Sequence, residues 1–342
     1  MKLVMPIWKS HASHYSICYL HFLQFFWVPY RRLSTSKGLI KLVEVGPRDG
    51  LQNEKVTVPT HVKVELVNKL SRAGITHIEV SSFVRPSWVP QLADASEVFG
   101  SITRNSGTKY IALVPNRTGM EKALKASVDE VAVFTAASEK FSVTNTNCTI
   151  DESMKNIEQV LQLAKEHAIP VRGYVSCVIR CPYEGAVAPD AVARVAEMLW
   201  SRGCYEISLG DTTGAGTPES MAALLSVVFD RPGACPREAV AVHCHDTGGN
   251  ALKNIRVALD DYKVNIVDSS IAGLGGCPYA GPNAPGNVAT EAVVAQLAKL
   301  GYSLSPQIRT EDLISIGSWI RGELAKLSSV PDKTSTTEAS RS

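Results

Sequence analysis

Paired cysteine motifs are absent from this chain. Its eight cysteines are scattered through 342 residues, and no CxxC pair is repeated. A chain of this length does not depend on a disulfide framework, and a structural zinc site needs clustered thiolates. We therefore expect free cysteines that pack as small buried hydrophobes in a reducing compartment.

Long uninterrupted apolar runs are also absent. The main candidate, residues 15–30, is broken by His21, Gln24 and Pro29 and falls short of the ~20 apolar residues that a membrane span requires. No GxGxxG motif opens a helix, which argues against a doubly wound sheet that binds a dinucleotide. We expect no membrane as a partner.

The first 43 residues contain no aspartate or glutamate. They hold six basic residues, which are Lys2, Lys9, Arg31, Arg32, Lys37 and Lys41. This composition is typical of a mitochondrial transit peptide, so we expect a leader over residues 1–38 and a place in the mitochondrial matrix, with the cytoplasm as the alternative. A secretory or anchoring segment and an extension without function are the competing interpretations.

The rest of the chain carries a slight excess of acid. Subtracting those six residues from the 35 basic residues leaves 29, against 33 acidic residues. A surface that binds polyanions needs the opposite balance, so we expect no nucleic acid as a partner.

Short apolar runs rich in β-branched residues alternate with segments of helical spacing. The expected strands are residues 41–45, 77–81, 109–114, 130–134, 171–177, 205–209, 240–245 and 265–269. The expected helices are residues 60–73, 88–99, 117–126, 151–167, 189–202, 218–229, 249–261 and 287–300. Eight such units predict an α/β fold, a (β/α)8 TIM barrel over residues 39–327. An accessory C-terminal helix is expected over residues 311–327, followed by a polar, disordered tail over residues 328–342.

Two histidines end one of the expected strands. His243 and His245 lie in the run AVAVHCHD, and residues two apart in a strand point to the same face. Asp49 follows the first expected strand, and the carboxyl ends of all strands of a TIM barrel meet at one rim. Imidazole and carboxylate ligands suit Mg²⁺, Mn²⁺ or a related ion better than a closed thiolate zinc site does. A core histidine held by a carbonyl is the competing interpretation.

Other reactive groups are expected at the same rim. Arg48 is expected to face an anionic oxygen, with a surface charge as the alternative, and Glu79 lies late in the second expected strand. Cys277 lies in the glycine-rich run AGLGGCPYAGPNAPGN, where backbone can approach a ligand closely and a nearby cation would favour the thiolate. A flexible surface loop with an incidental cysteine is the alternative.

Several of these motifs together resemble one family. Six segments occur in order between about residues 41 and 325: VEVGPRDGLQNEK, IEVSSFVRPSWVPQ, VRGYVSCVIRCPYEG, GCYEISLGDTTGAGTP, AVHCHDTGGNAL and VDSSIAGLGGCPYAG. Taken together they resemble the hydroxymethylglutaryl-CoA lyase family of metal-dependent lyase barrels. The resemblance covers the whole expected barrel and includes the loop cysteine.

The resemblance implies an activity and a metal site. The activity is the cleavage of 3-hydroxy-3-methylglutaryl-CoA to acetyl-CoA and acetoacetate, as in leucine breakdown and ketone-body formation. The implied cofactor is a divalent cation, Mg²⁺ or Mn²⁺. Its implied ligands are Asp49, His243, His245 and Asn287.

The resemblance also implies roles around the substrate. Arg48 would stabilise the enolate oxygen, Cys277 would be required for turnover, and His243 or Cys277 would move protons. The implied substrate-binding residues are Arg48, Glu79, Ser82 and Tyr174. We expect an acyl-CoA substrate and a homodimer as partners.

Three features depart from the family's pattern. The run IEVSS, with Val80, stands where IETTS is more familiar. Gly248 stands where an aromatic residue usually precedes glycine, and the segment from Cys277 to Asn287 is one residue longer. A condensing enzyme of the same superfamily, such as an isopropylmalate or homocitrate synthase, is the main alternative, although such enzymes carry a large C-terminal region. A catalytically silent barrel that acts as a scaffold is the other alternative.

Overall fold

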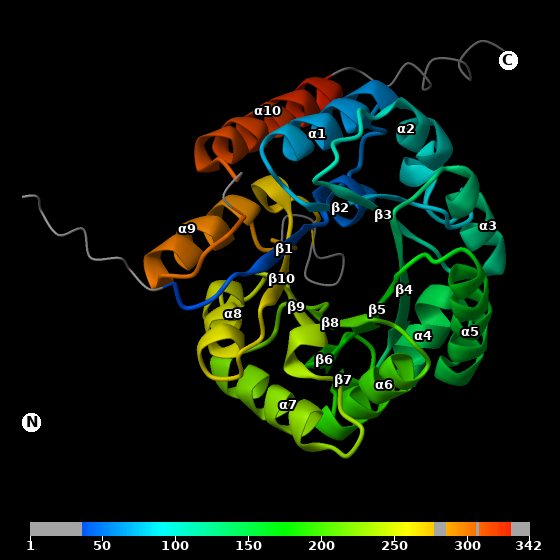
Figure 1. The fold of residues 1–342 in the computed structure, drawn as a ribbon, viewed down its shortest axis with the longest axis vertical. Coiled ribbons are helices and arrows are strands. Elements are labelled where there is room, and N and C mark those ends of the chain that lie inside the picture. The colour runs from blue at the N-terminus through cyan, green and yellow to red at the C-terminus, as the bar shows by residue number, and fades with distance from the viewer. Residues whose placement is uncertain (1–35, 277–284, 306–307, 330–342) are drawn as a thin grey trace, which may run out of the picture. The chain divides into compact units, whose positions relative to one another are not determined.

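A ring of parallel strands forms the centre of the molecule. The structure is a computed structural model that describes residues 36–276, 285–305 and 308–329. Within this part, eight parallel strands close into a barrel in the order β1, β10, β9, β8, β5, β4, β3, β2. The barrel strands are β1 (Lys41–Glu44), β2 (His77–Ser82), β3 (Lys109–Leu113), β4 (Glu130–Ala136), β5 (Val171–Ser176), β8 (Glu206–Asp211), β9 (Val240–Cys244) and β10 (Ile266–Ser269). The predicted (β/α)8 barrel is confirmed (Figure 1).

Helices surround the barrel on its outside (Figure 1). They are α1 (Thr60–Arg72), α2 (Ala95–Ser101), α3 (Arg117–Lys125), α4 (Glu139–Thr146), α5 (Ile150–Glu166), α6 (Pro189–Ser201), α7 (Pro218–Asp230), α8 (Ala251–Asp260), α9 (Thr290–Leu300) and α10 (Thr310–Ser328). The last helix forms the expected C-terminal extension and packs against α1 and α9. Among the residues described, no helix is long and apolar enough to cross a membrane.

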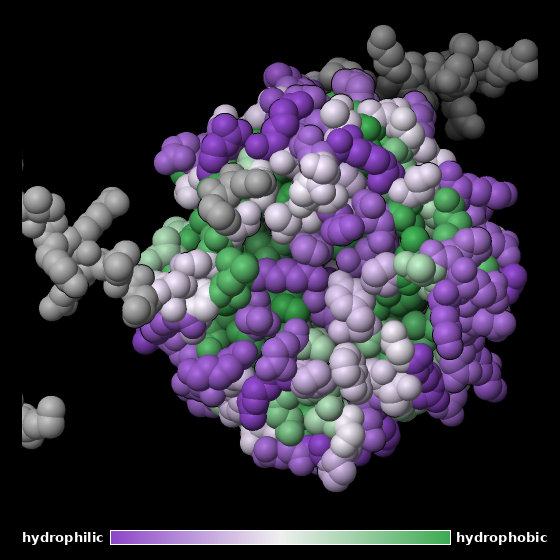
Figure 2. Space-filling view, viewed as in Figure 1, coloured by the Kyte–Doolittle hydropathy of each residue, from purple (hydrophilic) through white to green (hydrophobic). Residues whose placement is uncertain are grey.

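Alternation along the strands builds two apolar layers. Leu42 packs in the layer between the barrel and its helices, whereas its neighbour Val43 packs inside the barrel with Ile111. In the same view as Figure 1, polar side chains cover the outer helices and apolar patches show between them toward the centre of the ring (Figure 2). Side-chain burial on both faces of the strands therefore explains their nearly continuous apolar sequences.

Two of the expected helices begin three or more residues later than predicted. In place of a helix from residue 88, a 3-10 turn, η2 (Pro90–Leu92), precedes α2, because Val89 comes before a proline and its backbone is not helical, with φ −133° and ψ 78°. The helix expected from residue 287 begins only at Thr290, because Asn287 forms a bridge with His245.

One helix and two short strands were not predicted. Helix α4 has only one buried residue, Ser142, so its sequence lacks the apolar periodicity that marks a helix, and its start is capped by Ser138. The strands β6 (Arg180–Cys181) and β7 (Gly185–Ala186) form a hairpin outside the barrel and are too short for an alternating pattern. The predicted tail lies outside the described residues from residue 330 on, and so does the predicted leader up to residue 35.

A charged network fills part of the barrel interior. Arg172 on β5 is fully buried, and it donates to Glu206 on β8 at 2.6 Å, to Asp268 on β10 at 2.5 Å and to the Tyr174 hydroxyl at 2.6 Å. A buried charge is tolerated only when partners replace its lost hydration. Arg172 therefore links three strands of the barrel, β5, β8 and β10.

Replacing Arg172 by alanine is expected to lower the free energy of unfolding by about 3–5 kcal/mol, because the buried Asp268 carboxylate loses its cation and Glu206 keeps only Lys41. Urea-induced unfolding measures this loss. Arg202→Ala is the matched control, because the Arg202–Glu158 pair is partly exposed and its removal should cost about 1 kcal/mol or less. Equal losses in the two variants would contradict the role given to the interior network.

Candidate metal centre and active site

Three potential metal ligands meet at the carboxyl end of the barrel. Asp49 lies in η1 (Gly46–Gly50), the turn that follows β1, while His243 is the second-last residue of β9 and His245 follows that strand. The ligand atoms of these three side chains all lie within 4.8 Å of one another, and no other such group of His, Cys, Asp or Glu occurs in the part of the chain that the structure describes. The structure thus brings together the two histidines and the acid that the sequence predicted as ligands.

His243 is oriented by a second carboxylate. Its Nδ1 lies 3.3 Å from Oδ2 of Asp268, and its Nε2 lies 3.9 Å from Oδ2 of Asp49. A carboxylate at Nδ1 favours a proton there and leaves the Nε2 lone pair facing the cluster, which is the usual arrangement behind a metal-binding histidine. Asp268 also accepts hydrogen bonds from Ser208 and Arg172, so its position is fixed.

His245 offers a nitrogen that lacks a partner. Its Nδ1 is buried, and the described residues supply no hydrogen-bond partner for it. Burial, followed by the nearby His243, lowers the pKa of His245 to about 4, so the ring is neutral at physiological pH. A buried, neutral imidazole with a free lone pair fits a cation site, and this is the observation that supports a metal here.

Asn287 reaches the same cluster from the segment before α9. Its Nδ2 donates to Oδ2 of Asp49 at 2.8 Å and to the carbonyl of Leu274 at 3.2 Å. With the amide nitrogen committed to these acceptors, the carbonyl oxygen of Asn287 is the atom that could serve a cation. The longer preceding segment therefore does not carry Asn287 away from Asp49.

The Asp49 carboxyl is held in its ionised form. Burial alone would raise its pKa, but Arg48, His243, His245 and the hydrogen bond from Asn287 together lower the pKa to about 2. Asp49 is therefore a carboxylate over the whole physiological range, ready to bind a hard cation.

Arg48 lies beside the cluster, and three of its N–H groups donate to carboxylates. It donates from Nε and Nη2 to Glu79 at 2.9 and 3.2 Å and from Nη1 to Asp49 at 2.6 Å. Glu79 in turn accepts the Tyr174 hydroxyl at 2.6 Å, and the Arg48 guanidinium lies 5.7 Å from the centre of the Tyr174 ring. Three of the predicted substrate-binding residues thus form one connected group.

Two predicted site residues stand apart from this group. Ser82 ends β2 and is buried, and its hydroxyl accepts the backbone N–H of Val84 at 3.2 Å, a local turn contact. Cys277 lies outside the described residues, so its predicted role stays a prediction.

The residues that support the site were missed by the sequence reasoning. They are Arg172, Glu206, Ser208 and Asp268. The sequence does mark these four residues, because each is a polar residue at an inward-facing position of an otherwise apolar strand. A buried polar residue in such a strand points to a partner on another strand.

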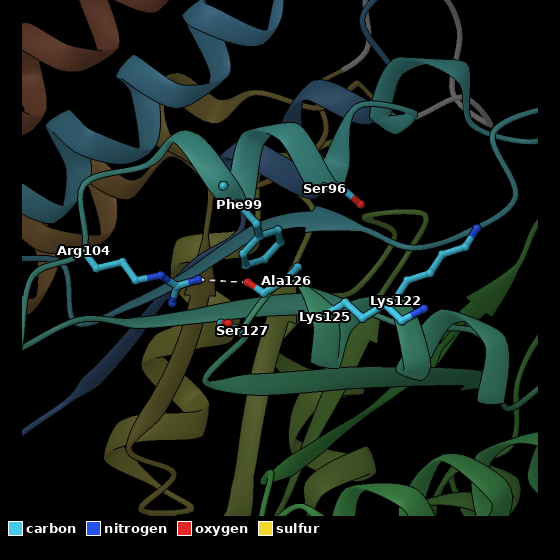
Figure 3. A pocket seen from close by; sticks show the side chains of 8 residues that line it. Ser96, Phe99, Arg104, Lys122, Lys125, Ala126 and Ser127 are labelled. Atoms are coloured by element: carbon cyan, nitrogen blue, oxygen red, sulfur yellow. Dashed lines mark hydrogen bonds between the residues drawn. The ribbon is translucent and has the colours of Figure 1, made fainter.

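A cavity lies between two outer helices, and another lies at the rim that carries the metal cluster. One of about 280 Å³ opens between α2 and α3 (Figure 3), where Arg104 donates to the Ala126 carbonyl and Lys122 and Lys125 extend from the last turn of α3. These lysines stabilise the negative end of the helix dipole. The cavity borders the start of β4, whereas Asp49 lies at the end where the strands finish, so the cavity is remote from Asp49. The other, of about 300 Å³, is lined by residues 52–55, 57 and 88–91, which follow η1 and β2 on the same rim as the metal cluster.

Comparison with known proteins identifies the family of this chain. Residues 39–320 match the HMGL-like family. The chain belongs to the HMGL-like family. The resemblance seen in the six sequence motifs is therefore confirmed.

Curated relatives of this HMGL-like chain come from two compartments. The cytoplasmic 3-hydroxy-3-methylglutaryl-CoA lyase of Rattus norvegicus is 54% identical over 278 residues, which is 80% of each chain. The mitochondrial hydroxymethylglutaryl-CoA lyase of Bos taurus is 51% identical over 281 residues, 82% of this chain and 84% of that protein. Both the predicted compartment and its alternative are represented.

Solved structures agree with the family. The HMG-CoA lyase of Brucella melitensis matches with a TM-score of 0.80 and 48% identity over 83% of this chain and 98% of that chain. An HMG-CoA lyase from Acenitobacter baumannii, solved in complex with coenzyme A and 3-methylmalate, matches with a TM-score of 0.77 and 32% identity over 87% of this chain and 96% of that chain.

In this HMGL-like chain, a buried acid ties η1, the turn that carries Asp49, to the segment that follows the neighbouring strand β10. Glu44 ends β1 and is completely buried; its Oε1 accepts the N–H groups of Gly46 and Ile271, each at 2.8 Å. Its Oε2 accepts the Thr290 hydroxyl at 2.6 Å. Burial raises the pKa of Glu44 to about 7, although these hydrogen bonds oppose the rise.

The raised pKa predicts how stability changes with pH. The pKa of Glu44 in the folded protein lies above the ordinary value of 4.5. The contribution of Glu44 to the free energy of unfolding is therefore complete below pH 4.5 and is lost as the pH rises through about 7. Relative to the wild type, Glu44→Gln should gain about 2–3 kcal/mol of unfolding free energy between pH 5 and pH 8. Urea titrations with a chelator present measure the difference, and Glu121→Gln on the exposed face of α3 is the control. A difference that does not change with pH would refute the assignment.

Proposed function

We propose that this chain is a divalent-metal-dependent lyase that cleaves 3-hydroxy-3-methylglutaryl-CoA to acetyl-CoA and acetoacetate. The observation that carries the proposal is the meeting of Asp49, His243, His245 and Asn287 at one rim in a chain of the HMGL-like family. The relatives at 54% and 51% identity carry this activity in their names.

The donor set supports Mg²⁺ or Mn²⁺ as the cofactor. A bound divalent cation would supply a Lewis acid that polarises the substrate hydroxyl and lowers its pKa. Asp49 and His245 are already deprotonated at neutral pH, because their pKa values are about 2 and about 4, so neither has to lose a proton before it binds the ion. Asp268 holds the His243 ring in the orientation that such a ligand needs.

Arg48 is suited to stabilise the charge that develops during the cleavage. Breaking the carbon–carbon bond leaves the acetyl-CoA part as an enolate, whose oxygen needs a positive donor close by. Three N–H groups of Arg48 are held by Glu79 and Asp49, and a guanidinium has five, so donors remain for the thioester oxygen. Because Glu79 and Asp49 fix the guanidinium, little reorganisation is needed when the charge appears.

Proton transfer needs a group beside the metal ligands. The His243 Nε2 that faces Asp49 cannot both bind a cation and accept the hydroxyl proton, since it has one lone pair. Its Nδ1 faces Asp268 and is not directed at the substrate. The geometry therefore favours His243 as a ligand and leaves the loop thiol of Cys277 as the proton-transfer group of this proposal.

An acyl-CoA substrate requires room beyond the metal cluster. The cavity of about 300 Å³ beside η1 and β2 lies on the correct rim and includes Lys55, a cation that suits the phosphates of coenzyme A. The solved relative that contains coenzyme A supports the same class of substrate. The homodimer expected from the sequence remains a prediction.

Acetoacetate formation from 3-hydroxy-3-methylglutaryl-CoA tests the function directly. We expect product when Mg²⁺ or Mn²⁺ is present, loss of activity when a chelator removes the ion, and recovery when the ion is restored. The same assay is run with and without a thiol reductant. Absence of product under every condition would refute the proposed reaction, and product that survives full chelation would refute the metal's role.

Arg48→Gln tests the stabilisation of the enolate. Turnover should fall about 100- to 1,000-fold while the KM for the substrate changes far less, because the stabilised charge appears mainly in the transition state. Arg117→Gln is the control, because it removes an exposed cation that pairs only with Glu121 on the same helix. Unchanged turnover in Arg48→Gln would remove Arg48 from this role.

A further inference from the structure

A strained residue lies at the start of the segment that leads to Asn287. Ala272 is the central residue of η4 (Ile271–Gly273), directly after β10, and its backbone is left-handed, with φ 57° and ψ 11°. This conformation is unfavourable for a residue with a Cβ atom, and such a residue adopts it only where the surrounding structure holds the backbone in place.

Two helices hold the backbone of Ala272 from both sides. Both carboxylate oxygens of Glu291 on α9 accept its N–H, at 3.2 and 3.0 Å, and the guanidinium of Arg321 on α10 donates to its carbonyl at 2.5 Å. Hydrogen bonds that involve a charged partner are the stronger kind.

Gly317 on α10 leaves the space that the Glu291 carboxylate occupies in this arrangement. A Cβ atom at this position would lie 2.1 Å from Oε1 of Glu291, a distance that no real contact allows. The glycine therefore has a packing reason in the middle of a helix, where it otherwise weakens the helix. A larger residue at position 317 would displace the Glu291 carboxylate from Ala272.

The clamped backbone connects directly to the metal cluster. Two residues after Ala272, the carbonyl of Leu274 accepts Nδ2 of Asn287 at 3.2 Å. The next carbonyl, that of Gly275, accepts the backbone N–H of Asn287, also at 3.2 Å. Asn287 then donates to Asp49 at 2.8 Å. A shift of η4 would therefore move the group that orients both Asn287 and Asp49.

We propose that Arg321 is a positioning residue of the metal site: together with Glu291 it fixes Ala272, and through Leu274 and Gly275 it sets the side chain of Asn287. The C-terminal helix α10 is then part of the support of the active site, although none of its residues reaches the cluster. This inference rests on the proposed metal site.

Titration with Mn²⁺ alone, followed by calorimetry and by the electron paramagnetic resonance signal of the free ion, tests the proposal in the full chain. Arg321→Ala should weaken Mn²⁺ binding about tenfold, the lower end of the range for residues that support ligands. Arg321→Lys should retain most of the affinity, because the ammonium can still donate to the Ala272 carbonyl. Lys326→Ala, which removes an exposed cation from the same helix, should bind as the wild type does.

A second variant separates positioning from folding. Glycine adopts a left-handed backbone without strain, so adding Ala272→Gly to Arg321→Ala should recover Mn²⁺ affinity at least threefold. Wild-type affinity in Arg321→Ala, or equal losses in the alanine and lysine variants, would overturn the proposal. A double variant that binds no better than Arg321→Ala would overturn it as well.

A further control distinguishes this inference from the function on which it rests. His245→Ala should abolish tight Mn²⁺ binding if the proposed metal site is correct. If it does so while Arg321→Ala binds normally, only the role of Arg321 is refuted. If His245→Ala binds Mn²⁺ as the wild type does, the proposed metal site itself is refuted.

Discussion

The Asp49 carboxylate is the point on which the rest of the site depends. One of its oxygens accepts Arg48 and the other accepts Asn287, while His243 lies 3.9 Å away. These three partners come from the turn after β1, the segment before α9 and the end of β9, which only a closed barrel brings together. Asp49 is partly buried, so Arg48 and these other donors must replace its lost hydration, and the surrounding residues must be placed accurately.

The support of this carboxylate extends through the barrel as a continuous chain of polar contacts. It runs from Arg48 through Glu79, Tyr174 and Arg172 to Asp268, which returns to the cluster at His243. Buried ionic networks add little net stability compared with an apolar core. This one is better explained by the site, since each member fixes the orientation of the next, and a bound cation would complete it.

The sequence was sufficient for the barrel and for the groups whose position follows from barrel geometry. His243, His245 and Asp49 could be predicted to meet because the carboxyl ends of parallel strands share a rim. The hydrogen-bond partners of these groups could not be predicted. The local sequence does not indicate that Asp268 faces His243, because that pairing depends on the register between β9 and β10. The late start of α9 was missed for a similar reason, since Asn287 is held by a contact with a distant strand end.

A crystal soaked with Mn²⁺ tests the central claim most directly, through the anomalous scattering of the ion. One peak is expected about 2.2 Å from an oxygen of Asp49, the Nε2 of His243, a nitrogen of His245 and the carbonyl oxygen of Asn287. A peak elsewhere, or a coordination sphere that leaves Asp49 out, would contradict the organisation of the site around this carboxylate.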